Sequence, residues 1–523
     1  MAAPTRARLL HLSGKRRPGS HWLGRGVLLL AVSLSVACNY VGEQPGDSPM
    51  PLVIGVSEGR AEGTEFGVGH LADQISTETF TAIGIDGRAQ PRLARSWSWE
   101  RNERQLRVRL REDVLLHDGR RFDSQLAAET LAVAIARRAN RAQYPALSDV
   151  TGAIPEGPFE LVLELGRPSA LLPEDLTVVV DVAAGPYRPV TTTKEGAIEL
   201  ERFDQYFLGR PSIPRITLRP FDTLRNAWAT LLRGELDMVY DVPADTIEFI
   251  RNDDVQVVAV PRWYQYMIAF NSGRGPLQSP LVRRALNLAV NRPALIDDVL
   301  NGAGSTSTGP IWPRYWAYDS SVPGVAFDPA EAEALLAEAG LDRYDAGNSE
   351  GAAPARLRFV CLIPENFSVW ERVALNVQRD LFEIGVDMQF KVVPFPEFND
   401  LIAKGEFDAV MLDVISGPTP GRPFMFWRSA KAVRGQYNVF GYENPEAEHN
   451  FDILRSSVNE AAVRSATRRL QRLMTEDPPA LFLAWNERAR AIRRNVVIPD
   501  SDRPDVMWTL AGWSRRLSLP ATE

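Results

Sequence analysis

The chain has 523 residues, of which 45% are hydrophobic and 24% are charged, a composition typical of a globular protein that is too long for one core. With 66 acidic against 59 basic residues, its net charge of −7 excludes the positive surface that general nucleic-acid binding requires. Because it contains two cysteines, Cys38 and Cys361, it is not a disulfide scaffold. We expect two or three ordinary globular domains.

Residues 1–37 are typical of an export signal. They contain six basic residues and no acidic one, and residues 26–37 form an apolar run of 12, too short to span a bilayer. Removing this segment leaves 53 basic and 66 acidic residues, a net charge of −13. We therefore expect a signal peptide, and no later stretch is apolar enough to span a membrane.

The end of this segment, Leu34-Ser35-Val36-Ala37-Cys38, resembles a bacterial lipobox, whose cysteine is acylated after cleavage. Ser35 stands where an aliphatic residue is usual, and an ordinary signal peptide with a chance cysteine is the alternative. Residues 38–50 are rich in Pro, Gly and polar residues without periodicity, which predicts a flexible, lipid-anchored tether. Sec and twin-arginine export both stay open, as does the membrane that carries the anchor.

The part after the tether begins with the alternating strands and helices of an α/β protein. Residues 52–56 predict a buried strand, and the following loop should enter a helix over 71–83. Residues 105–110 alternate apolar and charged side chains, as a half-exposed strand does.

The region 96–182 predicts a smaller α/β insertion. Asp123 or Ser124 should cap a helix that runs to about residue 139. Residues 161–165 predict a further strand.

Two similar stretches, 231–242 and 401–414, indicate a repeated strand-helix-strand unit. Each has an apolar helix end, a Gly-Glu-x-Asp sequence and a short apolar run. Gly234 and Gly405 suit the position just past a helix, because glycine adopts positive φ without a Cβ clash. The strand and helix that precede each stretch are expected at 215–220 and 222–233, and at 386–393 and 396–404. Two such units predict two α/β lobes, with a ligand cleft at the loops after these stretches.

Helix-capping signals are frequent in the second half of the chain. Asp328-Pro329-x-Glu331 combines an N-cap residue, a proline at the first helical position and a capping-box acid. Ser368 with Glu371 should cap the helix after a strand at 357–363. The alternation of strands and helices predicts a parallel α/β sheet with right-handed crossovers.

Several short stretches, in the same order along the chain, resemble the family five extracellular solute-binding proteins, the peptide- and nickel-binding components of ABC importers. The matching stretches are Pro91-Arg92-Leu93-Ala94-Arg95-Ser96-Trp97, residues 110–119, Gly185-Pro186-Tyr187, residues 233–237, Phe270-Asn271, residues 282–287 and residues 328–340.

The resemblance implies an α/β, two-lobed periplasmic-binding-protein-like fold of type II, with an additional α/β subdomain in the first lobe. Such a fold closes on its ligand by hinge motion. The expected divisions are a signal peptide at 1–37, a tether at 38–50, a first lobe at 51–95, 183–265 and 486–523, an inserted subdomain at 96–182 and a second lobe at 266–485.

By family analogy, side chains near the two crossings between the lobes face the cleft. These candidate ligand-binding residues are Tyr264, Tyr266, Asn271, Trp427 and Trp485. Aromatic side chains bury a large area at low entropy cost, which suits a cleft wall. The alternative for each is core or hinge packing. If Trp485 contacts the ligand, its truncation to Ala should weaken binding and leave the stability of the free protein nearly unchanged.

One departure from the family concerns Gly417, which stands about where peptide-binding members carry an aspartate that pairs with the α-amino group of the peptide. A buried ammonium without a carboxylate is costly. Arg422 and Arg428 follow in the same region and could favour an anionic ligand, or they could be solvated surface residues.

These features predict the substrate-binding component of an ABC importer, which captures a small solute, a peptide or peptide-like compound, and delivers it to a membrane permease. The alternatives are an exported lipoprotein that acts as a sensor or chaperone without transport, and a member that binds an anionic or sugar ligand. No GxSxG, HExxH or phosphate-loop motif indicates an enzyme. We expect no cofactor and no metal site, a monomer on the outer side of a bacterial membrane, and a permease and an ATPase as partners.

Overall fold

The computed structural model describes residues 50–57, 67–178, 180–243, 246, 253–342, 354–429, 438–500 and 505–516. The expected signal peptide, Cys38 and all but the last residue of the expected tether lie outside the described residues. Among the described residues, no helix combines the length and apolar character needed to cross a bilayer.

One mixed sheet of eleven strands, counted over the described ranges, runs through both halves of the chain. Its order is β15 (Val386–Val393), β14 (Leu357–Pro364), β16 (Ala409–Ile415), β12 (Val255–Phe270), β17 (Ala480–Arg493), β11 (Met238–Pro243), β1 (Leu52–Ser57), β10 (Arg215–Phe221), β9 (Ile198–Arg202) and β8 (Tyr187–Thr192), and β13 (Gly304–Thr306) pairs with β17 beside this path. We call the part built on β1 and β8 to β11 the first lobe, and the part built on β14 to β16 the second lobe. The domain limits expected from the sequence stay predictions.

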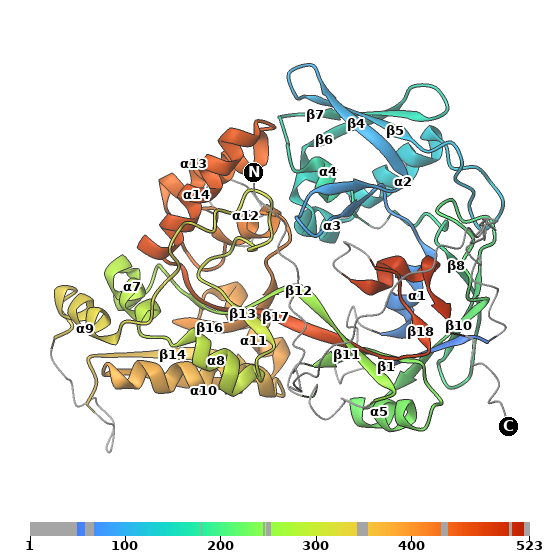
Figure 1. Ribbon diagram of the computed structural model, residues 1–523. Coiled ribbons are helices and arrows are strands. Elements are labelled where there is room, and N and C mark those ends of the chain that lie inside the picture. Colours follow the sequence, from blue (N-terminus) through green and yellow to red (C-terminus); the bar gives the residue numbers. More distant parts are fainter. Residues whose placement is uncertain are drawn as a thin grey trace, which may run out of the picture. The chain divides into compact units, whose positions relative to one another are not determined.

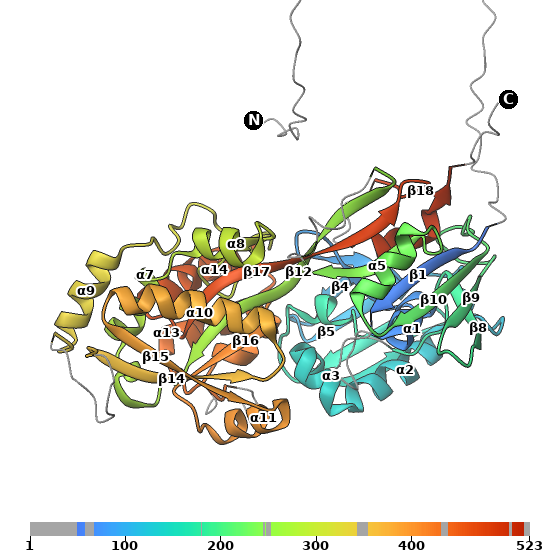
Figure 2. The same ribbon diagram turned by 90° about the horizontal axis from the view of Figure 1, so that it is seen from below.

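The two lobes are joined by β12 and β17, which pair antiparallel and run side by side from one lobe to the other (Figure 1, Figure 2). At one end β17 also pairs with β11 of the first lobe, and at the other end β12 also pairs with β16 of the second lobe. The register between β12 and β17 shifts between Pro261 and Gln265. The lobe crossing is therefore an irregular point in an otherwise continuous pair of strands.

The expected strand-helix-strand repeat is confirmed, and both copies have the same topology. In the first lobe β10 and β11 lie on either side of β1 and parallel to it, joined by α5 (Leu224–Leu232). In the second lobe β15 and β16 lie on either side of β14 and parallel to it, joined by α11 (Phe395–Lys404). Gly234 and Gly405 have φ of 79° and 69°, as expected for the position after a helix.

The aspartate of the Gly-Glu-x-Asp sequence has the same role in both copies. The Asp237 carboxylate accepts a hydrogen bond from the Val53 N–H of β1 at 2.8 Å. The Asp408 carboxylate accepts one from the Val360 N–H of β14 at 3.0 Å. Each aspartate thus ties the crossover to the central strand of its lobe, a structural use for the acid that the motif shares.

The region after β1 differs from the expected helix over 71–83. The helix α1 (Val68–Ser76) ends at Ser76, and the chain then forms β2 (Thr81–Ile83), which pairs with β3 (Ala89–Pro91). The reason is the extended conformation of Thr77, whose N–H makes the last helical contact, to the Asp73 carbonyl at 2.9 Å.

A second, antiparallel sheet forms within the expected insertion, in the order β4 (Ala94–Glu100), β5 (Gln105–Leu110), β7 (Glu160–Leu165) and β6 (Val150–Pro155). The expected helix to residue 139 is broken, because Arg137 is extended between α2 (Ser124–Ala136) and α3 (Arg138–Gln143). Asp123 caps α2 by accepting the Leu126 N–H at 2.9 Å. The turn η1 (Pro145–Asp149) and the short α4 (Leu172–Asp175) complete this part of the first lobe.

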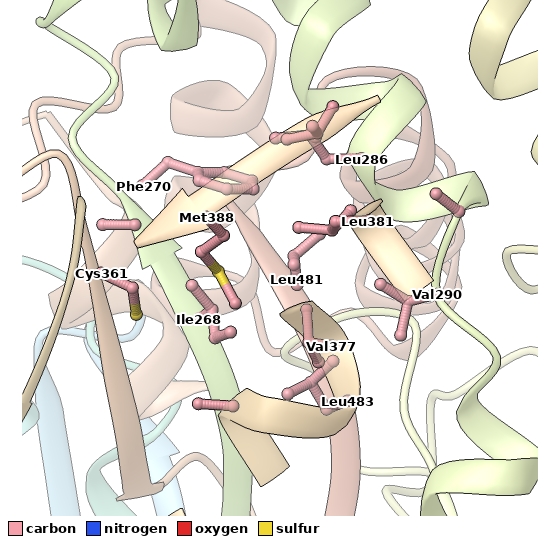
Figure 3. Packing of buried hydrophobic residues seen from close by; sticks show 14 of the residues in the cluster. Ile268, Phe270, Leu286, Val290, Cys361, Val377, Leu381, Met388, Leu481 and Leu483 are labelled. Atoms are coloured by element: carbon pink, nitrogen blue, oxygen red, sulfur yellow. The ribbon is translucent and has the colours of Figure 1, made fainter. Parts of the chain in front are cut away.

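Helices cover the sheet of the second lobe (Figure 1). They are α7 (Pro280–Leu288), α8 (Arg292–Leu300), α9 (Pro329–Glu338), α10 (Ser368–Glu383), α11, α12 (Gly421–Trp427), α13 (Pro445–Ser456) and α14 (Glu460–Glu476). Shorter elements are η3 (Gly275–Gln278), β18 (Val496–Val497), η4 (Val506–Gly512) and β19 (Ser514–Arg515). Figure 3 shows Ile268, Leu481 and Leu483 of the crossing strands packed with Val377 and Leu381 of α10.

One of the two capping predictions in this lobe is confirmed and the other is wrong. Asp328 accepts the Glu331 N–H at 3.0 Å and caps α9. At α10 the N-cap residue is Phe367, so Ser368 lies within the helix and makes no cap. The Glu371 N–H instead donates to the Phe367 carbonyl at 3.1 Å.

Candidate ligand site at the lobe crossing

The irregular point where β12 meets β17 gathers polar and aromatic side chains. Gln265 is fully buried, pairs in register with Trp485, and donates from Nε2 to the Gly309 carbonyl at 2.8 Å and to the Ser307 hydroxyl. Ser305 of β13 pairs with Trp485 from the other side. Gln265 therefore fixes the loop after β13 against the crossing strands.

A small pocket that opens to solvent lies beside Trp485, with a volume of about 20 Å³, enough for a water molecule. Its polar side chains are Thr306, Ser307, Thr308, Tyr318 and Gln471, and its lining contains no charged side chain. Gln471 is already engaged, because its side-chain amide both donates to and accepts from the backbone of residue 319. The hydroxyl groups suit an uncharged polar partner.

A carboxylate lies on the neighbouring strand of the crossing, at Asp413 of β16. It pairs in register with Tyr266, and both side chains contact Asn486, whose Nδ2 lies 3.1 Å from the Tyr266 hydroxyl and 3.2 Å from Asp413 Oδ2. Sequence reasoning missed both Asp413 and Asn486. The available signal was an acid in the middle of an apolar strand run, where a charged group needs a specific partner.

The loop after β16 folds back onto the crossing. The N–H groups of Ser416 and Gly417 both donate to the Trp263 carbonyl, at 2.8 and 3.1 Å. A Cβ on Gly417 would lie 3.1 Å from the Trp312 side chain. An aspartate at this position would therefore require Trp312 to move by a few tenths of an ångström, so the close packing of Trp312 disfavours a side chain here.

Arg422, at the start of α12, lies close enough to the buried Asp175 of α4 for their charges to interact. Burial raises the pKa of Asp175 to about 8, against the opposing effects of a hydrogen bond from the Ala146 N–H and of the charges of Arg422 and Arg455. Arg428 is buried and pairs with Asp452 at 2.9 Å. Both arginines thus lie near acids of this chain, and neither is simply a solvated surface residue.

Trp427, Trp485 and Asn271 each have packing or backbone contacts of their own. Trp427 is 1% exposed and packs against Phe440 and Phe482, with ring centroids 5.3 and 5.6 Å away. The Asn271 amide donates to the carbonyls of residues 405 and 407. Trp485 is 3% exposed and belongs to a core cluster, so its truncation should cost stability, contrary to the expectation from sequence.

The structure brings four of the sequence-derived candidates to the crossing: Tyr264, Tyr266, Gly417 and Trp485. Asn271 follows the end of β12 farther into the second lobe, and Arg422 and Trp427 lie on α12. Their contact with a ligand stays a prediction.

In the described ranges, no three His, Cys, Asp or Glu side chains gather in a way that could hold a metal ion. His117 contacts the Gly185 carbonyl at 2.9 Å and packs edge-on against Phe203. Burial lowers the pKa of His117 below its ordinary value.

Comparison with known proteins places this geometry in context. The family model of the bacterial extracellular solute-binding proteins, family 5, matches residues 88–435. The chain is 25% identical over 426 residues to the glutathione-binding protein GsiB of Pectobacterium atrosepticum, covering 75% of this chain and 80% of the relative. It is 23% identical over 424 residues to the oligopeptide-binding protein AppA of Bacillus subtilis, covering 74% and 77%.

Solved structures show the same fold. NikZ from Campylobacter jejuni, in complex with Ni(L-His), superposes with a TM-score of 0.72 at 19% identity, covering 90% of this chain and 100% of that one. AppA from Bacillus subtilis, in complex with a nonapeptide, superposes with a TM-score of 0.71 at 18% identity, covering 91% and 100%. The two-lobed expectation is thereby confirmed.

Proposed function

Because the chain belongs to the bacterial extracellular solute-binding proteins of family 5, we propose that it captures a peptide or peptide-like solute between its lobes for the permease of an ABC importer. The observation that carries the site is the gathering of Tyr266, Asp413 and Asn486 on one face of the sheet where β12, β16 and β17 meet, with Trp485 on the other face. A crossing between two lobes is where hinge closure brings both parts of a protein onto one ligand.

The ligand chemistry follows from the charges at the crossing. Since Gly417 carries no carboxylate and Trp312 packs closely against it, a carboxylate that meets a ligand ammonium group would come from another position. Asp413 is a half-buried acid of the crossing itself, within 3.2 Å of Asn486. We assign it as the counter-charge for a free amino group, with the neighbouring Tyr266 ring as a wall.

An uncharged ligand such as a sugar is the second candidate. It is favoured by the chemistry of the pocket beside Trp485, whose lining includes four hydroxyl-bearing residues and no charged side chain, although the pocket would have to widen to admit a sugar ring. A sensor or chaperone role without a permease would use the same binding geometry.

The cellular setting completes the proposal. Cys38 would carry a lipid anchor after removal of residues 1–37, and residues 38–50 would tether a monomer to the outer side of the membrane. The lobes would divide at the limits expected from the sequence. A permease and an ATPase would be its partners, and the protein would act as a binding component without catalysis.

The test is a thermal-shift panel on the purified chain with Cys38→Ser. The panel contains di- to pentapeptides, their N-acetylated forms, oligosaccharides, anionic metabolites and nickel chelates. A solute that binds only the folded state stabilises it by about 2.7 kcal/mol at 100 times its Kd. We expect free peptides to raise the melting temperature and their acetylated forms to have no effect.

The matched variants are Asp413→Asn, which should abolish the shift by free peptides, and Asp387→Asn on the outer strand β15, which should retain it. Shifts by acetylated peptides or sugars alone would contradict the role of Asp413. A panel without any shift would contradict capture of these solutes.

A further inference from the structure

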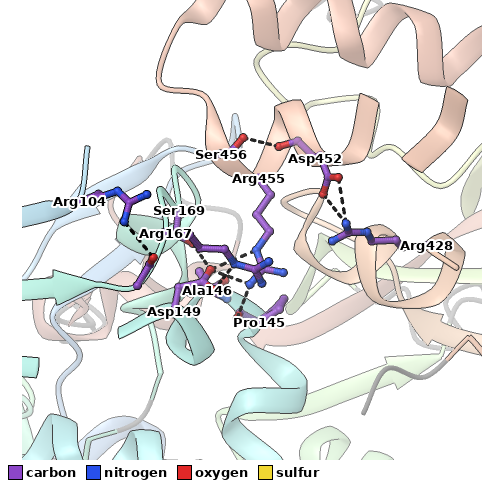
Figure 4. Close-up of polar contacts among 12 residues, drawn as sticks. Arg104, Pro145, Ala146, Asp149, Arg167, Ser169, Arg428, Asp452, Arg455 and Ser456 are labelled. Atoms are coloured by element: carbon purple, nitrogen blue, oxygen red, sulfur yellow. Dashed lines mark hydrogen bonds and ion pairs between the residues drawn. The ribbon is translucent and has the colours of Figure 1, made fainter. Parts of the chain in front are cut away.

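The two lobes also touch at a place away from the crossing strands, through a buried ion pair between Asp149 and Arg455. Asp149 ends η1 in the first lobe, and Arg455 lies on α13 in the second lobe. Nη2 of Arg455 donates to Asp149 Oδ2 at 2.7 Å, and the two side chains are 6% and 3% exposed (Figure 4). The chain separation is 306 residues, so only the approach of the lobes can form this pair.

Each partner of this pair is held in place by its own lobe. Asp149 also accepts the Ser169 hydroxyl at 2.7 Å and Nε of Arg167 at 2.6 Å, both within the first lobe. The Arg455 guanidinium lies 4.8 Å from the centroid of the Phe424 ring of α12. Because both groups are oriented in advance, little side-chain entropy is lost when they meet.

Backbone groups join the same contact. The Ala170 N–H donates to the Arg455 carbonyl at 2.6 Å. The first lobe therefore contacts Arg455 of α13 both at its main chain and at its guanidinium. Both hydrogen bonds join first-lobe groups to second-lobe groups. They exist only when the lobes are together.

A second inter-lobe contact lies at the turn between β2 and β3. The Trp316 N–H of the second lobe donates to the Asp86 carbonyl at 2.9 Å. The Arg88 guanidinium lies 4.0 Å from the centroid of the Trp316 ring and pairs with Glu460 of α14 at 2.8 Å. These side chains are more exposed than Asp149 and Arg455, so the contribution of this contact should be smaller.

Contacts that form only in the closed arrangement shift the equilibrium between open and closed forms. We propose that the Asp149–Arg455 pair, assisted by the Arg88–Trp316 contact, is a latch that stabilises the closed form without touching the solute. The proposal rests on the proposed function, because it presumes that the lobes open to admit a solute. The latch sets the fraction of closed protein and, through that fraction, the apparent affinity for any solute.

The test measures the distance between the lobes in the absence of solute, by single-molecule energy transfer. Dyes are attached to cysteines at two exposed positions, Gln125 of α2 and Glu338 of α9, in the chain with Cys38→Ser. The natural Cys361 is fully buried and should not react. Arg455→Met should move molecules from the closed to the open population by about tenfold, the usual range for a coupling of this kind.

The matched control is Arg188→Met, which removes an exposed arginine whose ion pair, with Glu201 at 2.5 Å, lies wholly within the first lobe. It should leave the closed population unchanged. Arg88→Gln should shift the population in the same direction as Arg455→Met but by less, and it keeps the test decisive if Arg455→Met does not fold.

An unchanged distribution in a folded Arg455→Met, or in Arg88→Gln where Arg455→Met fails to fold, would overturn the latch. Because no solute is present, this outcome is independent of the proposed function. If the population opens as expected and no solute of the panel binds, the latch stands and the proposed function fails. If solutes bind and both variants keep the wild-type distribution, the function stands and the latch fails.

Discussion

The substitution Trp485→Ala tests whether this residue of the crossing mainly stabilises the fold or mainly contacts the solute. Trp485 is 3% exposed and belongs to the same hydrophobic core cluster as Trp427 and Phe482, while one side borders the pocket. Truncation of a buried Trp to Ala costs about 3–5 kcal/mol through lost burial and the cavity left behind. Because the existing pocket already leaves part of the side chain without neighbours, we expect the lower end, about 3 kcal/mol.

The assay is urea-induced unfolding of the solute-free protein, followed by circular dichroism. The control is Trp508→Ala, since Trp508 is 36% exposed and a surface change of this kind stays within about 0.5 kcal/mol. A loss below about 1 kcal/mol for Trp485→Ala would refute the burial argument, because a core Trp cannot be removed so cheaply. Such a small loss would instead support the expectation from the sequence that Trp485 mainly contacts the solute.

Three further changes have defined outcomes. Burial raises the pKa of Asp175 to about 8, so this group stabilises the fold most below about pH 4, and the contribution is lost as pH rises toward 8. Asp175→Asn should therefore flatten the fall of the melting temperature between these values, and an unchanged slope would contradict the shift. Arg292→Met should lower the free energy of unfolding, measured in urea, by about 3 kcal/mol or more, because the buried guanidinium donates to several backbone carbonyls. Arg284→Met, a control at a half-exposed position, should lower it little. Asp408→Ala should speed hydrogen exchange of the Val360 amide, and equal protection would show that the strand does not depend on this carboxylate.

Local signals in the sequence predicted the repeat and some of the caps. A glycine after a helix and an apolar run define the end of one element and the start of the next, as at Gly234 and Gly405. The cap at Asp328 needs only residues within one turn. These features depend on neighbours along the chain, so the sequence contains what determines them.

The features that the sequence did not predict depend on distant contacts. The Ser368 prediction failed because Phe367 takes the N-cap position, and its ring stacks on Phe395 of α11 with centroids 5.5 Å apart. The close packing beside Gly417 comes from Trp312, and the pair of Asp149 with Arg455 joins two lobes. No periodicity or spacing encodes such contacts.

Solute uptake tests the central claim most directly. In the organism that encodes the protein, deletion of its gene should abolish uptake of a labelled solute that raises the melting temperature of the purified chain. Reintroduction of the wild-type gene should restore uptake, and reintroduction of a gene encoding Asp413→Asn should not. Uptake that persists unchanged after deletion would mean that this protein does not deliver the solute to a permease, and a sensor or chaperone role would then replace the importer.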